Sequence, residues 1–169
     1  MTTRFQNAVR VLVKAYLNDT LQHGNCHSCA VGNLIADAYG IAIVKSPHGD
    51  LLFDGSKKMV WSEGEPRWQY LFMTEESLHQ KYNIRNGDIS THSIFYTLRY
   101  VQLQGVCQTR RIDYMMEELA VIEKVFEMSE GKTREELIYN GLMNVVETLA
   151  ELDQLDLSVA EEAKLLFVK

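Results

Sequence analysis

The chain has 169 residues, 46% of them apolar and 24% charged, which is typical of one globular domain with a sizeable core. No stretch approaches the about 18 consecutive apolar residues of a membrane span, and the N-terminus lacks the apolar segment of a signal peptide. Three cysteines are too few, and an odd number, for a secreted disulfide scaffold. We therefore expect a cytoplasmic protein that does not associate with membranes.

The net charge of −6 is unevenly distributed, because residues 111–169 carry 14 acidic against 6 basic side chains. A net acidic chain gains nothing from counterion release on a phosphate backbone, so general binding to DNA or RNA is disfavoured. An acidic stretch of this kind is typical of solvated helix faces. The expected partners are other proteins or further copies of the chain, not nucleic acids.

The N-terminal part of the chain predicts two helices, each followed by a glycine that acts as a stop signal. Residues 3–22 repeat apolar side chains at three- and four-residue steps, and Thr3 with Gln6 has the spacing of a capping box. A second helix is expected over residues 26–39. Short connections favour antiparallel neighbours, so residues 1–40 are predicted to form a helical hairpin.

The middle of the chain, residues 41–105, predicts short strands or ordered loops, because apolar or aromatic runs alternate there with turn residues. The runs cover residues 41–44, 51–53, 59–61, 68–72 and 94–103. The last of them is compatible with a strand or a buried helix. Four aromatic side chains of this region are expected in the core, in a ligand pocket or at an oligomer interface: Trp61, Trp68, Tyr70 and Phe72.

The C-terminal residues 106–169 predict acidic helices. Thr133 with Glu136 and Ser158 with Glu161 have capping-box spacing, and each pair precedes an apolar helical stripe. The chain contains no internal repeat and no long linker. The predicted fold is therefore mainly α: a single-domain helical bundle with a small β or irregular insertion in the middle.

One segment, residues 23–32, carries candidate chemistry. If a helix begins at Cys26, then Cys26, Cys29 and Gly32 share one side of it, opposite an apolar stripe. Gly32 would allow another element to approach closely, and the helix N-terminus would stabilise a thiolate. Free cysteine is also among the most buried residue types, so the favoured interpretation is that both cysteines are ordinary buried small residues.

Two further interpretations use both cysteines. His23, Cys26 and Cys29 have the spacing of metal ligands and would form a structural zinc site, but a closed site needs four ligands and the chain has no second CxxC pair. A CxxC at a helix start is also a setting for thiol–disulfide exchange. A thioredoxin-like fold expects a strand before that motif, whereas a helix is predicted here.

A fourth interpretation makes one cysteine a nucleophile. Residues 24–29, Gly-Asn-Cys-His-Ser-Cys, resemble the papain-type signature, in which the second cysteine attacks from a helix N-terminus. This resemblance implies a cysteine-dependent hydrolase with Cys29 as the nucleophile and His92 as the base. Ala30 stands where the family has an aromatic residue, and His92 follows at a much shorter spacing than the family's histidine.

The same segment also resembles small bacterial or phage-borne proteins, in which a Cys-x-x-Cys-Ala-Val-Gly-Asn-Leu-like stretch follows an N-terminal helix and Glu-rich helices close the chain. The matching residues are Cys26, Cys29 and residues 30–34, together with the Glu-rich region 117–149. The resemblance implies no activity. The leading hypothesis is a non-catalytic interaction or assembly module, such as a homodimer, and the hydrolase, metal and redox hypotheses stay open as alternatives.

Overall fold

The protein is mainly helical and contains a small two-stranded sheet, as the sequence predicts. The computed structural model describes residues 3–47, 49–54, 68–82, 95, 98 and 112–169. The elements in this part of the chain are, in order, α1 (Arg4–Leu17), α2 (Ala30–Tyr39), β1 (Ile43–Lys45), β2 (Leu51–Phe53), the 3-10 helix η1 (Trp68–Phe72), α3 (Glu75–Tyr82), α5 (Met116–Glu127), α6 (Arg134–Leu152) and α7 (Leu157–Lys164).

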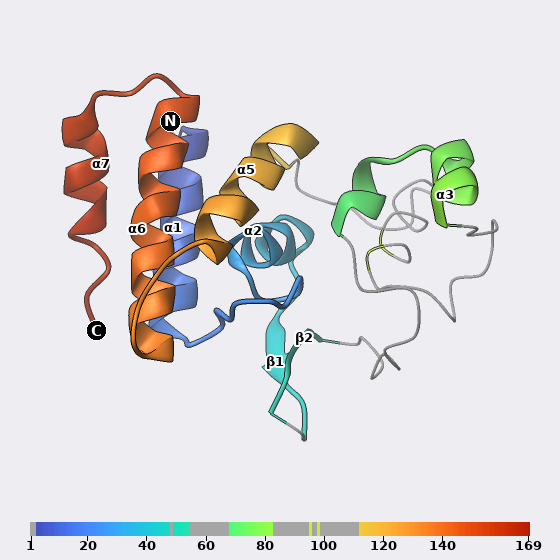
Figure 1. The fold of residues 1–169 in the computed structure, drawn as a ribbon, viewed down its shortest axis with the longest axis horizontal. Coiled ribbons are helices and arrows are strands. Elements are labelled where there is room, and N and C mark those ends of the chain that lie inside the picture. Colours follow the sequence, from blue (N-terminus) through green and yellow to red (C-terminus); the bar gives the residue numbers. More distant parts are fainter. Residues whose placement is uncertain (1–2, 48, 55–67, 83–94, 96–97, 99–111) are drawn as a thin grey trace.

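The N-terminal and C-terminal helices form one packed body. Helix α6 contacts α1, α5 and α7, and α2 contacts both α1 and α5. Figure 1 shows α1 and α6 side by side, with α7 on the outer side of α6 and the β1–β2 hairpin projecting below α2. The arrangement therefore joins segments from the two ends of the sequence around a shared core.

Helix α1 begins as predicted. Thr3 Oγ1 accepts the Gln6 N–H and Gln6 Oε1 accepts the Thr3 N–H, both at 3.1 Å, which is a complete capping box. The helix ends at Leu17, several residues earlier than the sequence predicts. Asp19 adopts a left-handed conformation with φ 55°, and a helix cannot continue through such a residue.

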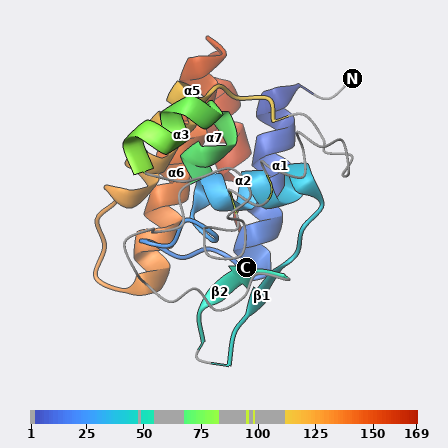
Figure 2. The same cartoon turned by 90° about the vertical axis from the view of Figure 1, so that its right-hand side faces the viewer.

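Helix α2 ends as predicted but begins later. Gly40 terminates it in the left-handed conformation with φ 66°, while Cys29 is its N-cap. The prediction that the helix begins at Cys26 is wrong, so the two cysteines do not share a helical face. Figures 1 and 2 show α2 crossing α1 steeply instead of running antiparallel to it.

The β1–β2 hairpin confirms the predicted small β insertion. The strands are antiparallel, with Ile43 opposite Phe53 and Lys45 opposite Leu51, so these four side chains share one face. Leu51 and Phe53 are buried, whereas Val44 on the opposite face is exposed. The hairpin thus packs one face against the helical body. The predicted run 59–61, and 94–103 apart from two buried residues, lie outside the described residues.

The aromatic run 68–72 forms η1, and α3 follows it, where the sequence predicts a short strand or loop. A 3-10 turn satisfies its own backbone hydrogen bonds, which a strand achieves only beside a partner strand. Trp68 and Tyr70 are buried, and the Trp68 indole N–H donates to the Glu123 carboxylate on α5. These two aromatic residues therefore belong to the core and offer no exposed interaction surface.

The C-terminal helices follow the prediction with one correction. Thr133 caps α6, because its Oγ1 accepts the Glu136 N–H at 3.1 Å. Helix α7 starts at Leu157, one residue before the predicted cap Ser158. Asp156 is the N-cap instead, since its carboxylate accepts the Ser158 N–H at 2.9 Å.

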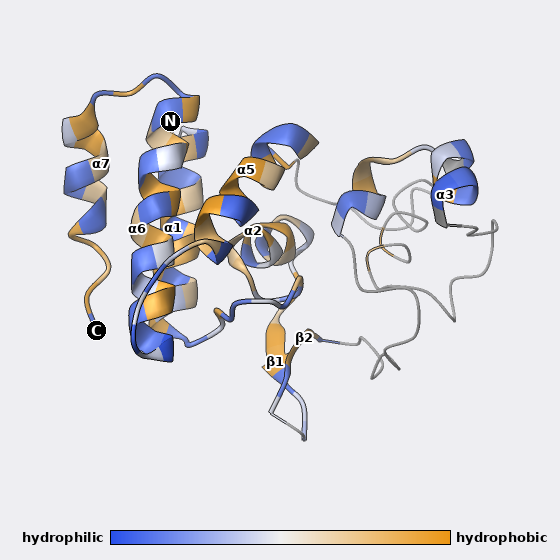
Figure 3. Cartoon of the chain, viewed as in Figure 1, coloured by the Kyte–Doolittle hydropathy of each residue, from blue (hydrophilic) through white to orange (hydrophobic). Residues whose placement is uncertain are grey.

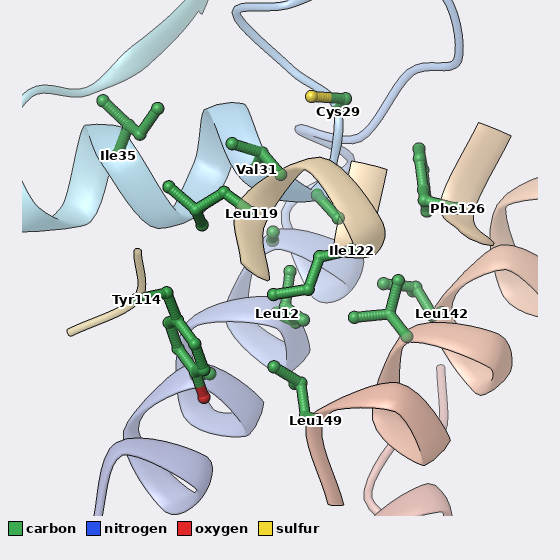
Figure 4. Close-up of a cluster of buried hydrophobic side chains, with 14 of the residues drawn as sticks. Leu12, Cys29, Val31, Ile35, Tyr114, Leu119, Ile122, Phe126, Leu142 and Leu149 are labelled. Atoms are coloured by element: carbon green, nitrogen blue, oxygen red, sulfur yellow. The ribbon is translucent and has the colours of Figure 1, made fainter. Parts of the chain in front are cut away.

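The core lies where α1, α2, α5 and α6 meet. Figure 4 shows part of it, including Leu12 of α1, Ile122 of α5 and Leu149 of α6, each with 0% exposure. Figure 3 shows that apolar and polar residues alternate along these helices, as amphipathic packing requires. Across the described part of the chain, no helix combines the length and apolar character needed to cross a membrane.

Arg4 connects the start of the chain to its C-terminal helices. Its guanidinium donates two hydrogen bonds of 3.0 Å to Glu118 and one of 2.7 Å to Asp153, and it lies 4.4 Å from the centre of the Tyr114 ring. Bidentate pairing of this kind fixes both distance and orientation. The cluster therefore sets the position of α1 relative to α5 and α6.

Candidate functional site

Residues 18–29, which we call the cysteine loop, are held in a compact turn by Asn25. Its Oδ1 accepts the His27 N–H at 3.0 Å, an Asx turn, and its carbonyl accepts the Cys29 N–H at 2.8 Å. Its Nδ2 donates to the carbonyl of Leu51 on β2 at 3.0 Å. These bonds hold the backbone before Cys29 out of the helix and attach the loop to the hairpin.

The buried side chain of Asn33 closes the loop from the α2 side. Its Nδ2 lies 2.8 Å from the carbonyl oxygen of Thr20, 3.3 Å from that of Ser28 and 3.1 Å from that of Cys29. Its Oδ1 accepts the Thr20 hydroxyl at 2.9 Å. One side-chain amide therefore bonds backbone carbonyls from both ends of the loop and ties its start to its end.

Cys29 has a structural role in this arrangement. Its Sγ accepts the Gly32 N–H at 3.3 Å, the bond of a helix N-cap, and the residue is only 1% exposed. Figure 4 shows it at the edge of the core cluster. Burial raises the pKa of the Cys29 thiol well above its ordinary value, and the hydrogen bond from Gly32 only partly opposes this. The thiol is therefore held neutral, whereas nucleophilic or redox chemistry needs a thiolate.

Gly32 makes the close approach that the sequence predicts, and the partner is the loop itself. A Cβ atom at this position would lie 2.4 Å from the Cys26 carbonyl oxygen and 2.6 Å from that of His27. Real Cβ atoms essentially never come that close to backbone atoms. The absence of a side chain at Gly32 therefore lets the cysteine loop fold onto the first turn of α2.

The predicted metal ligands His23 and Cys29 lie in different surroundings, and Cys29 is the N-cap of α2. The His23 ring stacks on Phe126 at 4.4 Å, and its Nε2 lies 2.9 Å from the Phe126 carbonyl oxygen and 3.0 Å from Ser129 Oγ. These contacts attach His23 to the end of α5. Within the described ranges, no group of three or more His, Cys, Asp or Glu side chains is placed to hold a metal ion. The zinc site at His23, Cys26 and Cys29 stays a prediction.

The hydrolase hypothesis pairs Cys29 with His92, and His92 lies outside the described residues. The structure therefore places only one member of the pair, Cys29, and it is a buried helix cap. The hypothesis keeps its status as a prediction, and the surroundings of Cys29 do not favour it.

His27 and Ser28 have the most unusual environment in the loop, and no local sequence signal indicates it. They are 2% and 0% exposed, yet His27 Nε2 and Ser28 Oγ have no hydrogen-bond partner in the part of the chain that the structure describes. The His27 ring lies 5.1 Å from the ring of Phe53 and stacks on that of Phe95 at 5.5 Å. Burial lowers the pKa of His27 to about 4. His27 therefore serves as a neutral aromatic member of the core.

A groove runs between the β1–β2 hairpin and the helical body. It consists of two hollows of about 570 Å³ and about 200 Å³. Asn18, Thr20 and Ile43 line both hollows, so the two adjoin. We call this surface the hairpin groove. The larger hollow alone is within the size range of ligand sites.

Three basic side chains line the hairpin groove without ion-pair partners in the described structure. Lys14 of α1 lines the smaller hollow, and Lys45 of β1 and Arg134 of α6 line the larger one. All three are exposed. Unpaired cations at a concave surface of a net acidic protein create a local region that attracts anions.

Most carboxylates along the groove are already paired. Asp37 lies 3.5 Å from Arg10, and Asp19 forms an ion pair with Lys169. The pKa of Lys169 is raised by its hydrogen bond to Asp19, with a smaller contribution from Glu135. The positive side chains in the groove are therefore only partly offset. No short sequence motif marks this site, because its residues come from distant parts of the chain.

Comparison with known proteins assigns no function to the cysteine loop or to the hairpin groove. No family model matches the chain, and no curated protein or solved structure matches it.

Proposed function

We propose that the protein is a non-catalytic interaction module of the cytoplasm, and that it binds a protein partner through the hairpin groove. The observation that carries the proposal is the groove itself, a concave surface lined by three cations that no described residue pairs. Its polar groups are available for a partner, whereas those of the cysteine loop are largely engaged within the fold.

The surroundings of Cys29 support a non-catalytic role. Its sulfur accepts a backbone hydrogen bond as a helix cap, and burial raises its pKa. A nucleophilic cysteine is instead partly exposed and has a lowered pKa. The cysteine motif is therefore better explained by its contribution to the fold.

Site-specific photo-crosslinking in the native host tests this proposal. A benzophenone amino acid replaces Ala42, an exposed residue that lines the groove, or Lys124, an exposed residue on α5 outside it. We expect adducts of defined mass from position 42 and none from position 124. An adduct of twice the chain mass would identify the partner as a second copy. Absence of adducts at position 42, or equal adducts at both positions, would contradict the proposal.

A further inference from the structure

The three unpaired cations are distributed along the hairpin groove. Lys14 lines only the smaller hollow, whereas Lys45 and Arg134 line only the larger one. A ligand that meets all three must therefore extend across both hollows. A single small anion contacts one position, but a chain with several carboxylates can reach them all.

The walls of the larger hollow are polar and apolar in about equal shares. Leu21 and Leu51 line it but are only 2% and 6% exposed, so they offer a partner little surface. The half-buried Ile43 lies where the two hollows join. Burying an apolar side chain against such a surface is favourable by roughly 25 cal/mol per Å². The groove therefore combines sites for negative charges in both hollows with a small apolar contact at Ile43 between them.

Arg134 has a position that helix stability does not explain. It is the first residue of α6, and the helix dipole disfavours positive charge in the first turn. Its charge is also unpaired in the described structure. Arg134 opposes the dipole of α6 and lines the groove. Its position is therefore better explained by binding an anionic partner than by helix stability.

We infer that the hairpin groove receives an extended acidic segment of a protein partner, in which an apolar side chain lies between carboxylates. This inference rests on the proposed function and specifies the partner's chemistry. The carboxylates pair with Lys45 and Arg134 in the larger hollow and with Lys14 in the smaller one. The apolar side chain packs on Ile43, where the two hollows join.

Selection from a displayed library of random decapeptides tests the inference with the full-length protein. The double variant Lys45→Ala/Arg134→Ala removes two groove cations. The control Lys81→Ala/Lys124→Ala removes the same charge from exposed positions outside the groove. We expect the wild type and the control to enrich peptides with two or more acidic residues flanking an apolar one. The double variant should lose this preference.

A blocked synthetic copy of the most enriched peptide then gives the affinity by fluorescence anisotropy. Exposed ion pairs are individually weak, so the double variant should bind about tenfold more weakly than the wild type and the control. Raising the salt concentration should weaken wild-type binding and reduce this difference.

Several results would overturn the inference. They are an absence of enrichment, enriched peptides with no acidic preference, and equal affinity for the wild type and the double variant. Stoichiometric binding of inorganic phosphate that displaces the peptide would instead identify a site for small anions. If position 42 still crosslinks to a partner in any of these cases, the proposed function stands and only the acidic-segment inference fails.

Discussion

The cysteine loop and the hairpin groove adjoin each other, because residues 18–21 of the loop also line the groove, yet they use polar groups in opposite ways. The side chains of Asn25 in the loop and of Asn33 on α2 are engaged with backbone groups, and Cys29 caps a helix. In the groove, three cations have no ion-pair partner in the described structure. Reactive residue types thus stabilise the fold, and ordinary lysine and arginine side chains remain available for binding.

This difference shows why a residue's environment decides its role. A thiol attacks or coordinates only as a thiolate, and burial disfavours the charged form. An exposed lysine at the rim of a groove can replace its contacts with water by contacts with a charged partner. Substitutions in the loop should therefore change stability, and substitutions in the groove should change binding.

The largest expected effect belongs to Gly32→Ala, at the contact of α2 with the loop. The added Cβ would overlap the Cys26 carbonyl oxygen, and the loop backbone there is held by the hydrogen bonds of Asn25 and Asn33. We expect a loss of about 3 kcal/mol or more in the free energy of unfolding, measured by urea denaturation.

Gly40→Ala is the matched control for this substitution. Gly40 has φ 66°, but a Cβ added there would have no neighbouring atom within 4 Å, so only backbone strain opposes alanine. That cost is about 1 kcal/mol. Equal effects at the two glycines would show that the loop does not pack against α2 as described.

The second prediction concerns acid stability. The pKa of His27 is about 4 in the folded protein, whereas in an unfolded chain it is about 6.5. Between these two pKa values the unfolded state binds a proton that the folded state does not. The contribution of His27 to the free energy of unfolding is therefore fully present above pH 6.5 and is lost as the pH falls towards 4. We expect this residue alone to cost about 3 kcal/mol at pH 4.

His27→Phe isolates that contribution, because it keeps an aromatic ring beside Phe53 and Phe95 and removes the titrating group. Urea denaturation at several pH values should show a smaller loss of stability in the variant than in the wild type. Identical pH dependence in both proteins would mean that His27 is not held neutral by burial.

Much of the fold follows from local sequence signals. Thr3 and Thr133 cap helices as predicted, and Gly40 ends one, because such signals act within a few residues. The predicted start of α2 is wrong because Asn25 forms a turn with its own side chain, which competes with the helix. Periodicity cannot detect that competition.

The candidate site is harder to predict than the fold. Lys14, Lys45 and Arg134 meet at one groove only because α1, the hairpin and α6 pack together. The sequence draws attention to Cys29 because cysteine and histidine residues stand close together there. Spacing alone does not reveal whether a thiol is exposed or buried.

The third prediction concerns the capping role of Cys29. Cys29→Ala removes the acceptor for the Gly32 N–H and should cost about 1 kcal/mol, whereas Cys29→Ser keeps an acceptor and should cost less. In the folded wild type, iodoacetamide should modify Cys29 only as fast as the protein unfolds, as followed by mass spectrometry. Rapid modification below a pH of about 8.5, the ordinary thiol pKa, would instead favour the hydrolase or redox hypothesis.

The smallest expected effect on stability belongs to the groove. Lys45 and Arg134 are exposed and unpaired in the described structure, so replacing both with alanine should change the free energy of unfolding by less than about 0.5 kcal/mol. Arg134→Ala alone should be slightly stabilising, because it removes a positive charge from the first turn of α6. Thermal denaturation of both variants measures this. A large loss in the free energy of unfolding would show that these cations stabilise the fold. The distinction between a structural loop and a binding groove would then be wrong.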